Sequence, residues 1–97
     1  MEVLNKPKLI HLALGDTFKI LRVEGGAGTK MPPHYSTLEA IIIVQEGEAM
    51  LQMPDGNHFL KKEDCFIIPA KKEHTLTIKK DFKAIAVMAV ESEINFI

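Results

Sequence analysis

Two histidines carry most of the chemistry that this sequence could perform. His34 lies in the Gly/Pro-rich stretch GTKMPPHYSTLEA, and His74 begins the segment HTLTIKK. A neutral imidazole binds divalent transition metals, and because it titrates near neutral pH it also donates or accepts protons. The pair could therefore bind a metal, transfer protons without one, or only form hydrogen bonds to water or to the neighbouring Tyr35 and Ser36.

The segments that position these histidines are patterned as β-strands. In HTLTIKK, His74, Leu76 and Ile78 fall on one face, and polar residues fall on the other. STLEAIIIV is continuously apolar at its centre, as in a strand buried on both faces. No segment has helical periodicity, and the chain is predicted to be all-β. The predicted strands cover residues 9–15, 17–24, 36–44, 49–53, 58–60, 65–69, 74–80 and 82–91.

Turn signals separate these strands at the short intervals typical of a sandwich or barrel. Residues 25–33, GGAGTKMPP, are predicted to be a loop because glycine and proline dominate them. QEGEA, at residues 45–49, is expected to turn the chain between two strands. PDGN, at residues 54–57, predicts a hairpin, with Asp-Gly supplying the positive φ angles of a type I′ turn.

The spacing of several residues resembles that of the cupins, a family of small antiparallel jelly-roll barrels. The first cupin motif contains a glycine, a His-x-His pair, a glutamate and a second glycine. Its spacing is matched by Gly28, His34 and Gly47, while Ser36 replaces the second histidine and Ala40 replaces the glutamate.

The second cupin motif is matched in spacing but less fully in residue type. Pro69 and His74 agree with it. Glu63 and Lys71 stand where the motif has glycine, and Ile78 stands where it has asparagine. The resemblance covers about half the chain, and it implies one cupin domain over residues 1–97 with the jelly-roll, or double-stranded β-helix, fold.

The resemblance also implies a metal site from which half of the ligands are missing. Cupins with a full set bind a divalent metal through three histidines and one glutamate, whereas this chain keeps His34 and His74. Glu39 lies on the opposite strand face from His34, Ser36 and Ala40, so only a β-bulge would bring it to the site. We expect no cofactor; a bound metal would be a divalent transition ion such as Zn, Ni, Fe, Mn or Cu.

The favoured hypothesis is a small-molecule-binding cupin with a degraded metal site. Its cavity walls are expected to include His34, Ser36, Ala40, Met50, Met53 and His74. One alternative is a metal-dependent isomerase or dioxygenase-like cupin that uses both histidines. Some cupin-like epimerases instead use a metal-free histidine with an orienting acid, but neither Asp64, at a turn, nor Glu73, on the opposite face, is placed to serve. Another alternative is a dimeric scaffold without a ligand.

Composition limits the partners. Twelve basic and thirteen acidic residues leave no basic surface for nucleic acid, and the longest aliphatic run is too short to span a bilayer. One cysteine, Cys65, and an N-terminal segment without signal-peptide features indicate a cytoplasmic protein. Cys65 is expected to be a small core residue. Surplus aliphatic residues indicate packing against a second sheet or a second subunit, and we expect a homodimer: Ile41, Ile43, Ile67, Ile85 and Val87.

Overall fold

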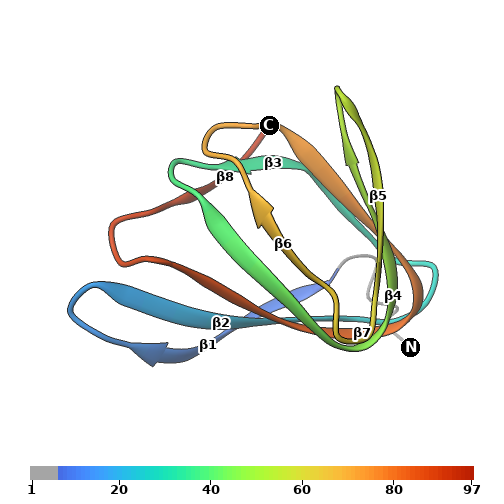
Figure 1. Cartoon of the computed structure of the whole chain (residues 1–97), viewed down its shortest axis with the longest axis horizontal. Helices are drawn as coiled ribbons and strands as arrows, with labels where there is room; N and C mark the ends of the chain where they lie inside the picture. The colour runs from blue at the N-terminus through green and yellow to red at the C-terminus, as the bar shows by residue number, and fades with distance from the viewer. Residues whose placement is uncertain (1–6) are drawn as a thin grey trace, which may run out of the picture.

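The computed structural model describes residues 7–97, which form one strongly curled sheet of eight antiparallel strands (Figure 1). Residues 1–6, part of the segment behind the cytoplasmic prediction, lie outside the described residues. Within residues 7–97 no helix is long and apolar enough to cross a membrane. The strands are β1 (Lys8–Leu14), β2 (Phe18–Gly25), β3 (Lys30–Ser36), β4 (Ala40–Met53), β5 (Gly56–Lys61), β6 (Cys65–Ile68), β7 (His74–Ala89) and β8 (Ile94–Phe96).

Two long strands, β4 and β7, organise the sheet. β7 pairs with β2, β3 and β4, and β4 pairs in addition with β5 and β6. The strands wrap around a common centre, with β1, β2 and the second half of β7 along one side and β3 and β8 on the other (Figure 1). The prediction of an all-β chain is confirmed.

The core lies inside this curl. In the first half of β7, His74, Leu76 and Ile78 are buried, as their alternation in the sequence predicted. In the second half, the even-numbered residues from Phe82 to Met88 are buried. The buried apolar side chains form one cluster: Leu21, Val23, Met31, Ala40, Val44, Ala49, Leu51, Leu60, Ile68, Leu76, Ile78, Phe82, Ala84, Ala86 and Met88.

The turn predicted at residues 45–49 is wrong, because β4 runs through it without a break. The strand bends there: its register against β7 shifts between Val44 and Ala49, and Gly47 has a φ of +85°. A Cβ on Gly47 would overlap the carbonyl oxygen of Asp81 in β7. The segments 74–80 and 82–91 were predicted as two strands, but residues 74–89 form one bent strand, β7. It pairs with β4 on both sides of the bend, so β4 and β7 bend together.

The loop predicted at residues 25–33 is shorter than expected, since β3 begins at Lys30 and includes both prolines. Proline lacks an N–H for the ladder, and the pairing of β3 with β7 shifts register between Met31 and His34. The shift brings His34 opposite His74.

The predicted hairpin between β4 and β5 is confirmed, but its predicted turn type is wrong. Met53 pairs with Gly56, so the two loop residues are Pro54 and Asp55. Proline holds φ near −65°, which a type I′ turn does not allow. Two further expectations fail: β8 follows the strand predicted to be last, and Cys65 is exposed because it lies on the outward face of β6.

Two residues other than glycine have positive φ angles among the described residues: Glu63 at 76° and Lys71 at 62°. Both stand where the cupin motif has glycine. Hydrogen bonds fix these conformations, since the Glu63 N–H donates to the carbonyl of Val44 at 2.9 Å and the Lys71 N–H donates to that of Ser36 at 2.7 Å. The backbone therefore keeps a glycine conformation under side chains that strain it.

Replacing either strained residue by glycine is expected to stabilise the protein. Removing the left-handed penalty outweighs the greater entropy of the unfolded glycine, with a net gain of about 0.5–1 kcal/mol for Glu63→Gly and for Lys71→Gly. Urea denaturation measures the free energy of unfolding. The control is Lys62→Gly, an exposed neighbour without positive φ, which is expected to lose about 0.5 kcal/mol. A loss in both test variants would contradict the strain.

Candidate functional site

The inward faces of the strands enclose a cavity whose wall is almost entirely apolar. The centres of water molecules can occupy about 50 Å³ of it. No acidic residue, lysine or arginine is among the described residues that line it, so its polar groups are two imidazoles and one hydroxyl. The lining residues are Leu9, Val23, Met31, His34, Ser36, Ala40, Ile42, Leu51, Leu60, Ile68, His74, Leu76, Phe82, Ala84, Ala86, Met88 and Ile94.

The two histidines meet at this cavity. His34 on β3 and His74 on β7 are register partners, and their ring centres lie 4.1 Å apart at an interplanar angle of 64°. Only 5% and 4% of their surfaces are exposed, respectively. The convergence of both imidazoles, on which the sequence-based hypothesis depended, is therefore present in the structure.

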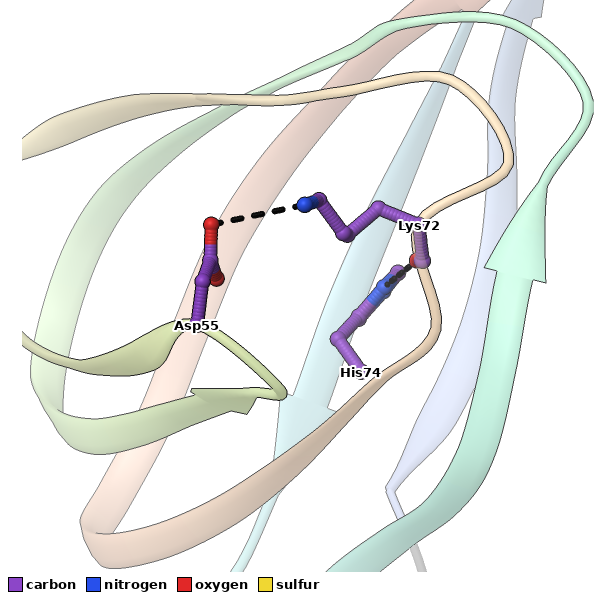
Figure 2. Close-up of polar contacts among 3 residues, drawn as sticks. All are labelled: Asp55, Lys72 and His74. Carbon is purple, nitrogen blue, oxygen red and sulfur yellow. Dashed lines mark hydrogen bonds and ion pairs between the residues drawn. The ribbon is translucent and has the colours of Figure 1, made fainter.

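Each imidazole is held by a backbone carbonyl two residues before it. His34 Nδ1 lies 2.7 Å from the Pro32 oxygen. His74 Nδ1 lies 2.9 Å from the Lys72 oxygen, as Figure 2 shows. A carbonyl oxygen only accepts hydrogen bonds, so both Nδ1 atoms must carry the proton. In the neutral rings, each Nε2 is then an unprotonated acceptor.

Burial keeps both rings neutral. Desolvation lowers the pKa of His34 to about 4, against the opposing effect of its hydrogen bond to Pro32 and with a further lowering by His74. Desolvation also lowers the pKa of His74 below its ordinary value, although the bond to Lys72 acts in the other direction. Neither ring is charged near pH 7.

Contacts outside the cavity position the two imidazoles. Lys72, whose carbonyl accepts from His74, extends its side chain to Asp55 in the β4–β5 turn, with 3.3 Å between Nζ and Oδ2 (Figure 2). On the other side, the ring of Phe96 in β8 lies 5.2 Å from that of His34. The loop before β7 and the strand β8 therefore each support one histidine.

Of the other residues expected at the cavity, Ser36 and Ala40 lie on its wall and are buried. Met50 and Met53 do not line it. Met50 points outward beside Thr77 and Phe59, and Met53 lies at the hairpin end of β4, where it packs against the edge of the core. The lining methionines are Met31 and Met88.

The sequence offered Met31, Met50, Met53 and Met88 as possible pocket residues, and Met31 and Met88 were not assigned to the wall for different reasons. Met88 falls on the inward side of the alternation that runs through Ala84 and Ala86, so extending the strand pattern would have found it. Met31 has no such signal, because the register shift between it and His34 breaks the alternation.

The cavity does not fit the four-ligand metal of full cupin sites. Ala40 offers no donor, Glu39 is exposed in the bend before β4, and residues 7–97 contain no group of three potential ligands. With metal–nitrogen distances of about 2.1 Å, two imidazoles at a tetrahedral angle have ring centres roughly 5 Å apart. The observed 4.1 Å is shorter, since the edge of one ring packs against the other.

Comparison with known proteins decides the family. The model of the cupin domain family matches residues 20–90. The chain belongs to the cupin family. Its jelly-roll fold is confirmed by similar solved structures, among them a cupin superfamily protein from Desulfitobacterium hafniense DCB-2, with 23% identity and a TM-score of 0.79 over 94% of this chain and 84% of that one.

Other similar structures show how widely proteins with this fold differ. A double-stranded β-helix protein from Klebsiella pneumoniae has a TM-score of 0.81 and 16% identity over 98% of this cupin and 89% of that chain. The DMSP lyase DddQ from Ruegeria pomeroyi DSS-3 has a TM-score of 0.84 and 20% identity, over 94% of this cupin and 51% of that chain. No curated protein matches the sequence. At these identities the likeness shows the fold alone.

The lowered histidine pKa values predict a loss of stability in acid. As the pH is lowered from 6.5 to about 4, the unfolded chain takes up protons at these histidines and the folded cupin does not. The free energy of unfolding therefore decreases as the pH decreases. We expect His34 to account for on the order of 2 kcal/mol of the fall, less than the full shift because solvent screens part of it.

Chemical denaturation at pH 7 and pH 4.5 measures this loss. His34→Gln is expected to remove part of it, whereas His11→Gln, at an exposed position on β1, should keep it. Equal acid sensitivity in parent and His34→Gln would contradict the assignment.

Proposed function

We propose that this single cupin domain binds a small, largely apolar molecule in its cavity and has no resident metal. The observation that carries the proposal is an apolar cavity that meets two neutral, converging imidazoles. Such a wall with a few converging polar groups is the usual composition of a small-molecule site.

The small side chains of the wall support binding over a purely structural barrel. Ala40, Ala84 and Ala86 are buried, and they face the open space from β4 and β7. Protein interiors are normally packed with few voids larger than a water molecule, so a barrel serving only as a scaffold would be expected to fill its centre.

A metal-dependent isomerase or dioxygenase-like enzyme is the competing function. It would need waters or a chelating substrate to complete a two-imidazole site. Metal-free acid–base chemistry is also poorly supported, because each imidazole is oriented by a carbonyl oxygen rather than by a carboxylate.

Binding is tested by thermal denaturation with small neutral fragments. A ligand of the folded state raises the melting temperature with concentration, by roughly 10 °C or more at a ligand concentration about 100 times Kd. Ala86→Val, which fills the cavity from β7, is expected to abolish the rise. Lys79→Ala, at an exposed position of β7 outside the cavity lining, should keep it.

Elemental analysis of protein purified without a histidine tag separates the two functions. We expect less than a tenth of an equivalent of transition metal. Close to one equivalent in the parent, lost in His74→Ala, would overturn the metal-free proposal, and no stabilising fragment would overturn ligand binding.

We further propose that the cupin is a homodimer, joined through the outward face of β2, β7, β4 and β6. Two rows of side chains cross these strands. Ile41, Ile43 and Ile67 are 40%, 41% and 57% exposed, an unusual cluster for a surface facing water. The rows consist of Ile67, Ile41, Val87 and Ile20, and of Cys65, Ile43, Ile85 and Arg22.

Sedimentation at micromolar concentration tests the dimer. Ile43→Lys puts a charge at the centre of the rows and is expected to give monomers, weakening association by at least 100-fold. Leu14→Lys, at a position 75% exposed on β1, is the control and should remain dimeric. A parent that is monomeric, or an Ile43→Lys dimer, would contradict this interface. Separately, we propose a cytoplasmic location, because the single cysteine, Cys65, can form no intrachain disulfide, as is usual in a reducing compartment.

A further inference from the structure

Both histidines present the same kind of atom to the cavity. The Nδ1 atoms donate hydrogen bonds to the carbonyl oxygens of Pro32 and Lys72. Each Nε2 is therefore the ring nitrogen that remains available to a bound molecule. Since both Nδ1 atoms are donors, both Nε2 atoms are acceptors in the neutral rings. The two rings that carry these acceptors are neighbours in the cavity lining, with their centres 4.1 Å apart.

The remaining wall supplies little to a ligand that only accepts hydrogen bonds. Among the described lining residues, the Ser36 hydroxyl is the one other side-chain polar group, and all other lining side chains are hydrocarbon or thioether. A carbonyl or ether oxygen next to the histidines would meet the lone pairs of the two Nε2 atoms. It has no hydrogen to donate, so both Nε2 atoms would lack a hydrogen-bond donor. Unsatisfied buried acceptors weaken binding.

A charged ligand is also disfavoured. The described part of the wall contains no lysine or arginine for an anion and no carboxylate for a cation. Lys72, next but one to His74, is directed to Asp55 at 3.3 Å instead. An ion without a partner in an apolar cavity loses its hydration without compensation.

Size gives the last limit. About 50 Å³ of space for water centres corresponds to roughly three or four water positions. The buried part of the ligand therefore has only a handful of non-hydrogen atoms.

From these features we infer that the cavity selects a compact, uncharged molecule that is hydrocarbon over most of its surface and donates a hydrogen bond, from a hydroxyl or N–H group, to Nε2 of His34 or of His74. Carboxylates, phosphates and molecules that only accept hydrogen bonds are rejected. This inference rests on the proposed function and specifies its ligand class.

The first test measures the tautomers in the parent protein. Long-range ¹H–¹⁵N NMR spectra at pH 7 are expected to show a protonated Nδ1 and a bare Nε2 in both His34 and His74. A protonated Nε2 in either ring would overturn the inference, and this measurement needs no ligand and no variant.

The second test compares three probes with the same ring, followed by the methyl resonances of Ala86 and Met88. Cyclopentanol donates a hydrogen bond, cyclopentanone only accepts, and cyclopentanecarboxylate is an anion. We expect cyclopentanol to bind at least tenfold more tightly than cyclopentanone, and the carboxylate not to bind.

The outcomes separate this inference from the function beneath it. Equal affinity for alcohol and ketone, or tighter binding of the carboxylate, overturns the inference and leaves small-molecule binding standing. Binding of none of the three overturns both. His74→Phe removes one acceptor at similar size and should reduce the preference for the alcohol at least threefold. His58→Phe, at a histidine outside the cavity wall, should leave the preference unchanged.

Discussion

The paired bend of β4 and β7 is the constraint on which the rest of the molecule depends. Two strands of this length would form a flat ribbon if they were straight, and a flat ribbon has no interior. Gly47 allows the backbone of β4 to approach that of Asp81 where no side chain fits, so the two strands fold over together while their ladder continues on both sides. Both halves of each strand then face the same interior, which becomes the cavity.

The same bend explains why the site is simple. His74 begins β7 and pairs with His34 at the end of the curl, so the ladder itself sets the distance between the imidazoles. Their orientation is set locally, since each ring donates to the carbonyl two residues earlier in the chain. The two imidazoles are therefore positioned independently of Ser36 and Ala40, which stand where the cupin motif has its other two ligands.

The sequence predicted the strands of this fold more reliably than the connections between them. Alternation identified His74, Leu76 and Ile78 as inward-facing, and motif spacing placed His34, Ser36 and Ala40 at the cavity wall. Gly47 was interpreted as a turn because glycine serves equally in a turn and in a bent strand, and only the approach of Asp81 distinguishes the two. The prolines of β3 led to the prediction of a loop where there is a strand. The inward position of Met31 could not be predicted either, because the register shift between Met31 and His34 interrupts the alternation of inward and outward residues. The tautomers also lay beyond sequence reasoning, since they depend on backbone carbonyls.

The order of the strands has a consequence for how the chain acquires its structure. β2 pairs with β7, and β3 pairs with β7 and β8. These early strands therefore cannot complete their pairing until much later segments of the chain have been synthesised. Long loops must close before such contacts form, and proteins of this topology fold slowly for their size. During that interval the isoleucine-rich beginning of β4 can pair with β6 on one edge, but its other edge, which β7 will cover, is open and prone to aggregation. Nascent chains that stop before β7 are therefore expected to need chaperone protection, and coexpression yield should depend on it more than the stability of the finished barrel suggests.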